Sequence, residues 1–207
     1  MNLATYDGLK SAVSSFLNRA DLVEQVPAFI TMAEAKFNRE LRVNNMLQRD
    51  YTNTTRDYLE LPCDWLQHSS IVVTAPAQYK RALDYVSPEE FNDLRNGTPK
   101  GTPRVYTIIS NSIALLPAPA QSVTLEIAYY EQIPALTAES QSNWLLKRSP
   151  DLYLYGSLMN AEPYLMNDER VPLWSAAVGQ AIEAMRMESE RAMRPSGALA
   201  ARRRTFG

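Results

Sequence analysis

Side chains that could carry covalent or acid–base chemistry are few and scattered in this sequence. Cys63 and His68 are its single cysteine and single histidine, and they stand near each other at an expected strand start. A thiol and an imidazole can form a nucleophilic pair or bind zinc, but both functions need further ligands or an orienting group. We therefore interpret this pairing as chance, and the sequence predicts neither a metal site nor a disulfide.

Adjacent acidic residues offer an equally weak case for acid–base catalysis. Glu89-Glu90 and Asp168-Glu169 both fall at expected helix starts, where the helix dipole favours negative charge. The sequence lacks the G-x-S-x-G, H-E-x-x-H, Walker and G-x-G-x-x-G motifs, and its seven glycines are too dispersed to cradle a phosphate. We expect no enzyme activity and no cofactor.

Positive charge is concentrated at the C-terminus. Residues 1–190 hold 16 Lys and Arg against 23 Asp and Glu, a net charge of −7, whereas residues 191–207 hold five Arg and no acid, a net charge of +5. A helix-stopping run, Arg194-Pro195-Ser196-Gly197, precedes the last ten residues. The candidate binding residues of this tail are Arg202, Arg203, Arg204, Thr205 and Phe206.

Three interpretations of the tail remain open at this point. A chain end is often solvated and disordered. Arginines can also pair with carboxylates of a partner protein, with Phe206 as an apolar anchor. They could equally contact DNA phosphates, although the rest of the chain is acidic.

Composition describes an ordinary folded protein. The chain has 207 residues, of which 45% are hydrophobic and 21% charged, so it can bury roughly 70% of its unfolded surface in one or two cores. No apolar run approaches the roughly 20 residues that cross a bilayer, and the start MNLATYDGLK does not look like a signal peptide. We expect a protein made in the cytosol that contacts no membrane.

Residues 5–43 predict two helices. Apolar residues recur at helical spacing in both, and Asp21 with Glu24 suggests a capping arrangement before the second, where Pro27 fits the first turn. The opposite face of the second helix is expected to be solvated; it carries Glu34, Lys36, Arg39, Glu40 and Arg42.

Residues 44–134 change to strand-and-turn composition, and eight of the thirteen prolines lie between Pro62 and Pro134. Alternation puts Leu125, Ile127 and Tyr129 on one face of the last strand. Ser87-Pro88-Glu89-Glu90 starts a short helix that Asn96-Gly97 ends. The expected strands are 58–61, 69–74, 104–109, 113–116 and 123–130.

From about residue 140 the pattern is helical again. Ser149-Pro150-Asp151 starts a helix that is apolar on most sides and is expected to be central and buried, and a long helix follows from about Asp168 to Met193. The outer face of the long helix is expected to carry Glu183, Arg186, Glu188, Glu190 and Arg191.

Together these segments predict an α+β fold, mainly α: a four-helix bundle formed from the N- and C-terminal segments, with a β-rich insertion and an extended C-terminal tail. The expected domains are a helical bundle from residues 1–43 and 140–194, a β-rich insertion at 44–139, and a tail at 195–207.

Three stretches in this order resemble a known family, the head-to-tail adaptor or head-completion proteins of tailed bacteriophages. YDGLKSAVSSFLNRADLVEQVPAFITMAEAKFNRELRV is similar to its paired N-terminal helices, and PRVYTIISNSIALLPAPAQSVTLEIAYYEQIP to its proline-bracketed strands. SPDLYLYGSLMNAEPYLMNDERVPLW is similar to its buried third helix and the start of the fourth.

The resemblance implies a structural protein of the virion neck that assembles in the host cytoplasm. It would form a ring of about twelve copies on the portal vertex and connect the DNA-filled head to the tail. Its implied partners are the portal protein, neighbouring copies and a downstream tail or nozzle protein; packaged DNA would pass through the channel without specific recognition. The tail residues 202–206 would bind the portal.

The alternative is a DNA-binding accessory protein that uses the basic C-terminus. An enzyme of unrecognised type would need a deep pocket with converging polar groups.

Overall fold

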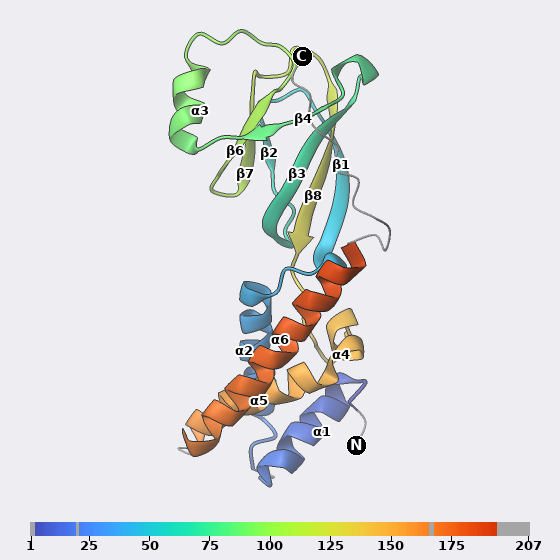
Figure 1. Cartoon of the computed structure of the whole chain (residues 1–207), viewed down its shortest axis with the longest axis vertical. Helices are drawn as coiled ribbons and strands as arrows, with labels where there is room; N and C mark the ends of the chain where they lie inside the picture. The colour runs from blue at the N-terminus through green and yellow to red at the C-terminus, as the bar shows by residue number, and fades with distance from the viewer. Residues whose placement is uncertain (1–2, 20, 166–167, 194–207) are drawn as a thin grey trace. The chain divides into compact units, whose positions relative to one another are not determined.

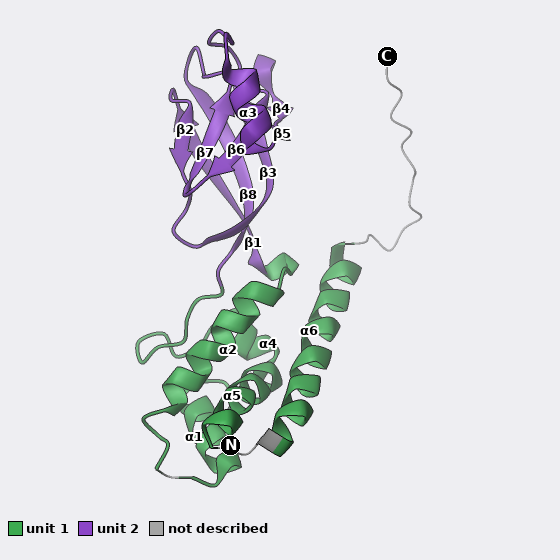
Figure 2. Ribbon diagram, turned by 90° about the vertical axis from the view of Figure 1, so that its left-hand side faces the viewer, with its two compact units in different colours: residues 1–45, 133–207 green, residues 46–132 purple. Residues whose placement is uncertain are grey.

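A computed structural model describes residues 3–19, 21–165 and 168–193 and divides the chain into two units. The first unit is formed by residues 1–45 and 133–207, and the second by residues 46–132 (Figure 2). The sequence placed the corresponding boundaries after residues 43 and 139. The second unit is therefore an insertion between two halves of the first, and each unit has its own core.

The first unit is helical (Figure 1). Its elements are α1 (Tyr6–Leu17), α2 (Val26–Glu40), α4 (Trp144–Arg148), α5 (Pro150–Tyr164), η3 (Asp168–Arg170) and α6 (Val171–Met193).

The ends of α1 are fixed by side chain and backbone. Thr5 caps its start, since the Thr5 hydroxyl accepts a hydrogen bond from the amide of Gly8 at 3.2 Å. Asn18 ends it in the left-handed conformation, with φ of 51°. The N-terminal end is also tied to the second half of the unit, because the Tyr6 amide donates to the Gln141 carbonyl at 2.7 Å.

The capping arrangement predicted before α2 is wrong. Gln25 occupies the N-cap without a side-chain cap, although Pro27 does stand in the first turn. Asp21 instead accepts a two-bond pair from the Arg19 guanidinium, at 2.7 and 2.6 Å. That pair lowers the pKa of Asp21 to about 2. Asp21 is therefore engaged in an ion pair with Arg19 and does not cap α2.

Helix α5 is the centre of the helical unit. It contacts α1, α2, α4 and α6. Its buried residues lie on all sides of the helix: Leu152, Tyr153, Leu154, Gly156, Ser157, Leu158, Ala161 and Glu162. The expectation of a central, buried helix is confirmed.

The prediction of a four-helix bundle is wrong, although an α+β fold is observed. In a four-helix bundle each helix presents one apolar stripe to a shared axis. Here α5 itself occupies the axis, because it is apolar all round, and the other helices pack around it. The sequence also missed α4, whose five residues are too few to show a helical period.

The second unit consists mainly of strands. After η1 (Asn44–Met46), its elements are β1 (Leu47–Thr54), β2 (Tyr58–Glu60), β3 (Trp65–Ala75), η2 (Ala77–Tyr79), β4 (Arg81–Ala82), β5 (Asp84–Tyr85), α3 (Pro88–Arg95), β6 (Val105–Ile109), β7 (Ser112–Leu116) and β8 (Val123–Glu131).

Within the described residues these strands form two four-stranded sheets, with strand orders β1-β8-β3-β4 and β2-β7-β6-β5. Strands β1 and β3 flank β8, and both run antiparallel to it. Strand β6 pairs antiparallel with β7 and parallel with β5. The turn between β6 and β7 has a positive φ of 55° at Ser110, as short hairpin turns commonly require.

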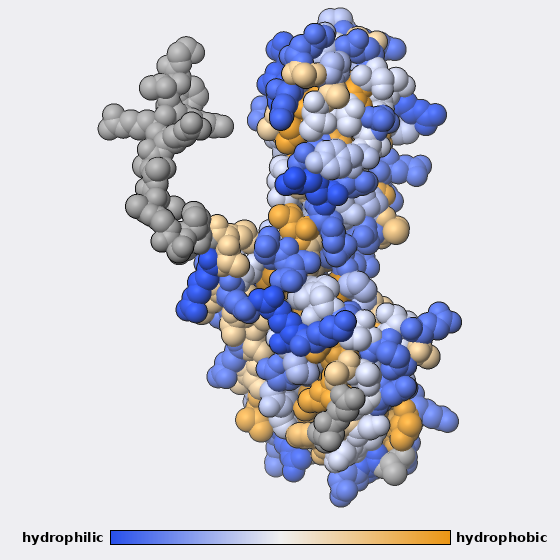
Figure 3. All heavy atoms as spheres, turned by 90° about the vertical axis from the view of Figure 1, so that its right-hand side faces the viewer, coloured by the Kyte–Doolittle hydropathy of each residue, from blue (hydrophilic) through white to orange (hydrophobic). Residues whose placement is uncertain are grey.

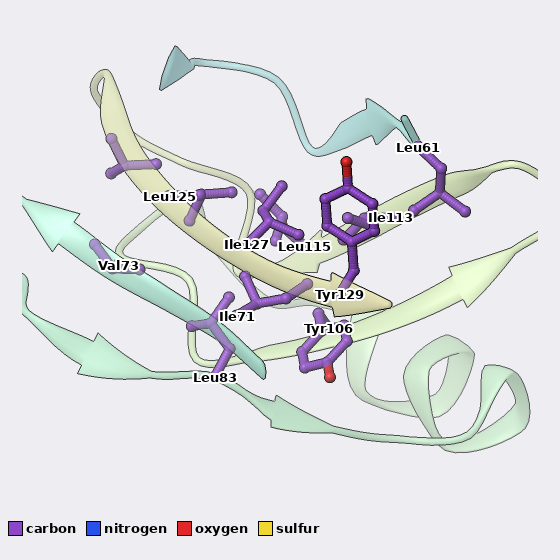
Figure 4. Packing of buried hydrophobic residues seen from close by; sticks show 11 residues of the cluster. Leu61, Ile71, Val73, Leu83, Tyr106, Ile113, Leu115, Leu125, Ile127 and Tyr129 are labelled. Carbon is purple, nitrogen blue, oxygen red and sulfur yellow. The ribbon is translucent and has the colours of Figure 1, made fainter. Parts of the chain in front are cut away.

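Side chains from both sheets share one core (Figure 4). Leu125, Ile127 and Tyr129 of β8 all point into it, which confirms the predicted alternation. Ile71 and Ile113, from one strand of each sheet, are fully buried beside them. The two sheets therefore pack face to face, because each has a single apolar face to bury.

Strand β1 was missed by the sequence analysis. It runs alongside β8 over its whole length, from the pair Leu47–Tyr130 to the pair Thr54–Val123. Most of its side chains are exposed, including Asp50 on the face that β8 turns to the core. An edge strand with polar side chains on both faces has no alternation to detect.

Candidate interaction surfaces

The residues predicted to bind a partner, Arg202, Arg203, Arg204, Thr205 and Phe206, lie outside the described residues, which end at Met193. Their role stays a prediction. The structure does describe the helix that carries them, α6, and what holds that helix in place.

The C-terminal half of α6 is fastened to the segment that follows α2. The Asn44 amide donates to the Ser189 hydroxyl at 2.8 Å, and the Arg186 guanidinium donates to the Glu40 carbonyl at 2.7 Å. Met185, one turn before Ser189, is buried. These contacts fix the last turns of α6, from which the tail departs.

A third attachment comes from α4. Arg148 forms an ion pair with Glu188 of α6 at 2.6 Å, and the same guanidinium donates to the Asn45 side chain at 3.4 Å. Both charged groups are partly exposed, so the pair contributes little free energy and mainly sets position. A small hollow of about 250 Å³ lies among these residues. Sequence reasoning missed this anchor because α4 was missed.

The charged residues predicted for the outer face of α6 are exposed, which confirms that prediction. Glu183, Arg186, Glu188, Glu190 and Arg191 are all exposed. The first part of the helix, from Val171 to Ile182, has no charged residue. Several of its side chains are nevertheless exposed, and Leu173 has 61% of its surface accessible. In Figure 3 the helical unit shows several small hydrophobic patches separated by hydrophilic residues. Small, separated apolar groups of this kind are common on protein surfaces and do not by themselves mark a binding site.

The predicted solvated face of α2 needs one correction. Glu34 is only 5% exposed and belongs to a buried polar network. Its carboxylate accepts from the Leu136 amide at 2.9 Å and from the Tyr153 hydroxyl at 3.1 Å. Asn143 completes the network by donating to the Tyr153 hydroxyl at 2.6 Å and to the Pro134 carbonyl at 2.7 Å.

This network fastens the segment by which the chain returns from β8 to the helical unit. The Asn38 side chain also accepts from the Ile133 amide at 2.9 Å. Burial raises the pKa of Glu34, and the two donated bonds oppose that rise. Burial and the nearby Glu34 raise the pKa of Tyr153, so its hydroxyl stays a donor. Glu34 lies at helical spacing from the buried Ile30 and Phe37, so it shares their face of α2, although its charge suggested the solvated face.

The other chemistry-bearing residues are placed apart from any converging site. His68 stacks on Tyr85 with ring centroids 5.1 Å apart and meets the edge of Tyr106 at 5.9 Å. Cys63 is exposed in the turn before β3. Among the residues that the structure describes, no group of three or more His, Cys, Asp or Glu side chains could hold a metal ion.

Trp65 and Trp174 each stack on a tyrosine ring and so contribute to packing. Trp65 stacks on Tyr129 at 5.1 Å, and Trp174 stacks on Tyr155 at 5.6 Å. The Trp174 indole also donates to Glu162 at 3.2 Å and so joins the first turns of α6 to α5.

Each of the helices in the described ranges is too short or too polar to cross a membrane.

Comparison with known proteins places this architecture in a family. The family model described as SU10 adaptor protein matches residues 4–203, which covers both units and reaches into the basic tail. Among proteins with curated descriptions, none matches the chain. The match supports the coarse part of the resemblance seen in the sequence, a phage adaptor with a structural role. The chain belongs to the SU10 adaptor protein family.

Proposed function

We propose that this protein is a head-to-tail adaptor that docks as a ring on the portal vertex and connects the DNA-filled head to the tail. The observation that carries the proposal is the family match from residue 4 to residue 203. The matched region includes the helical unit, the inserted β unit and Arg202 and Arg203 of the tail. A structural adaptor needs surfaces that bind its neighbours and does not need to convert a substrate. We therefore propose that the protein is not an enzyme.

In this proposal the tail is the portal-binding element. Residues 198–207 could span at most roughly 33–36 Å if extended. Their three consecutive arginines suit bidentate pairing with carboxylates, and Phe206 suits an apolar slot. The three attachments of the end of α6, to Glu40, Asn44 and Arg148, support this assignment, because a docking arm needs a fixed base.

The remaining partners follow from the same role. Neighbouring copies would complete a ring of about twelve, and a downstream tail or nozzle protein would bind the opposite side. Packaged DNA would pass through the channel without specific recognition, since the chain outside the tail is acidic. The protein would act at the virion neck, after assembly in the host cytoplasm.

The test compares the full chain with a variant that lacks residues 198–207, in co-sedimentation with purified portal rings. We expect the shortened protein to keep its circular dichroism spectrum and to lose portal binding. Equal binding by both proteins would refute the role of the tail. Replacing Arg202, Arg203 and Arg204 by serine should weaken binding in the same assay.

A matched control removes the same charge elsewhere. Arg39, Arg56 and Arg81 are exposed in the described structure, and their replacement by serine should leave portal binding within about twofold. A gel-shift with duplex DNA at physiological salt tests the alternative. A shift that depends on Arg202–Arg204, together with unchanged portal binding by the serine variant, would favour a DNA-binding accessory protein.

A further inference from the structure

A second candidate binding surface lies in the β unit, on the side where α3 packs against β6 and β7 (Figure 1). There the end of α3, the following loop and the ends of β6 and β7 enclose an open hollow of about 390 Å³. The volume is enough for one or two large apolar side chains. All residues that line the hollow belong to the second unit, residues 46–132.

The lining of the hollow is apolar at its base. Leu116 and Val105 come from the strands and pack on the small core that Val86 and Phe91 form. Leu94 and Pro117 complete the apolar lining, and Leu94 is 44% exposed. An exposed leucine beside a hollow of this size leaves apolar surface in water, and a ligand could cover it.

The rim of the hollow is cationic. Lys100 and Arg104 line it and are exposed, and among the described residues neither has a carboxylate within salt-bridge distance. No acidic residue of the described chain lines the hollow. Asp57 lines the neighbouring hollow, which shares Lys100, and stands 3.9 Å from Arg95. Charge complementarity therefore favours an anionic ligand.

Backbone hydrogen bonds hold the walls of the hollow in place. The Gly101 amide donates to the Ala118 carbonyl at 2.8 Å, and the Ala120 amide donates back to the Gly101 carbonyl at 3.0 Å. The Arg104 amide donates to the Leu116 carbonyl at 2.8 Å. The loop is thereby joined to the segment after β7, and the site is formed before any ligand arrives, which lowers the entropy cost of binding.

We propose that this hollow docks an acidic peptide segment of another protein, with one apolar side chain on Leu94, Val105 and Leu116 and flanking carboxylates on Lys100 and Arg104. The arginine-rich tail of this chain does not fit, because its charge has the same sign as the rim. A nucleic acid would meet only two cations and would gain nothing from the apolar base. The proposal is independent of portal docking by the tail.

The test is a selection from a displayed library of random peptides of about twelve residues. The full-length protein is the target, and the double variant Lys100→Ser/Arg104→Ser serves for counter-selection. We expect enriched peptides to carry a Leu, Ile, Met, Phe or Trp next to Asp or Glu. Absence of enrichment over the double variant, or enrichment of peptides without acidic residues, would overturn the proposal.

Binding of the best enriched peptide is then measured by fluorescence anisotropy. We expect about a tenfold loss of affinity for the Lys100→Ser/Arg104→Ser variant and a similar loss for Leu94→Ser. The matched control is Lys80→Ser/Arg81→Ser, which removes two exposed cations outside the hollow and should change affinity less than about twofold.

Two further outcomes would contradict the proposal. If a duplex DNA probe binds through Lys100 and Arg104 and displaces the peptide, while Leu94→Ser has no effect on either ligand, the site recognises phosphate. If the protein alone self-associates in sedimentation and Leu94→Ser abolishes that association, the hollow is an interface between copies of this chain.

Discussion

Gly156 lies where α5 packs against Ala33 and Phe37 of α2. A Cβ atom at this position would stand 2.7 Å from the Phe37 ring and 3.2 Å from the Ala33 side chain. Phe37 is fully buried and packs edge-on against Tyr153 at 5.4 Å, so its ring has little room to move. The glycine therefore sets the spacing of the two helices at the centre of the helical unit.

Replacing Gly156 by alanine should destabilise the protein by about 1–2 kcal/mol, because the clash with Phe37 outweighs the better helix propensity of alanine. Chemical unfolding followed by circular dichroism measures the loss. Gly179→Ala in α6 is the control, since a Cβ there meets open space, and it should raise the free energy of unfolding by about 0.5–1 kcal/mol. Equal effects of the two variants would contradict this account of α5 packing.

Glu34 predicts a dependence of stability on pH. Burial raises its pKa in the folded state, so the folded protein binds this proton more tightly than the unfolded chain does. The resulting stability is present below the unfolded pKa of Glu34 and is lost as the pH rises through the raised, folded value. Above that value the buried carboxylate is charged, and no cation of the described residues forms an ion pair with it.

We expect Glu34→Gln to be at least as stable as the parent protein at pH 7, because the amide oxygen can still accept from Leu136 and Tyr153. The advantage should shrink as the pH falls towards about 4, where the glutamate itself is neutral. Unfolding experiments across this range test the slope, with exposed Glu139→Gln as the control. A Glu34→Gln variant that is much less stable at neutral pH and keeps the parent slope would show that the burial argument fails.

At the scale of elements, α6 is attached to the helical unit at both ends. Its first turns meet α5 through Trp174, and its last turns meet the segment after α2 through Arg186 and Ser189. Glu162, the acceptor for the Trp174 indole, is 2% exposed. Loss of the indole donor would therefore leave a buried carboxyl group without this bond.

Trp174→Phe should cost about 1–3 kcal/mol, since it retains an aromatic ring for stacking but removes the donor to Glu162. The double variant Trp174→Phe/Glu162→Met should recover part of that loss, because both polar partners are then removed together. Thermal unfolding compares the single and double variants. Purely additive effects of the two substitutions would exclude a coupling between these side chains.

The elements differ in how far the sequence predicts them, and burial and length together explain the difference. β8 and α5 were predicted because each is buried, one with strict alternation and the other with apolar residues on every side. β1 and α4 were missed because β1 is a polar edge strand and α4 has only five residues. Packing was not predictable either: helical periodicity identified α5 without showing that it occupies the centre.

The candidate binding residues of the tail rest on composition alone and stay a prediction. The charge contrast located the tail, and the exposed acids and arginines of α6 followed from its period. The hollow beside α3 could not be found in the sequence, since its lining comes from a helix end, a loop and two strands. Lys100 and Arg104 stand in an ordinary Gly- and Pro-rich connection, where nothing marks them as a shared rim.

At the scale of the whole molecule, the β unit is an insertion with neighbouring ends. Leu47 near its start pairs with Tyr130 near its end, and its main core consists of its own residues. We expect an isolated fragment of residues 46–132 to fold. A dispersed amide spectrum by nuclear magnetic resonance would confirm this, with Leu125→Asp as the unfolded reference, whereas a collapsed spectrum for both fragments would show that the helical unit is required.

The proposed adaptor role is tested most directly by electron microscopy of the purified protein mixed with its portal. The account predicts a ring of this protein on one face of the portal, with each C-terminal segment leaving the end of α6 and lying on a portal subunit. Rings in which residues 198–207 fold back on their own helices, or the absence of any complex, would contradict it.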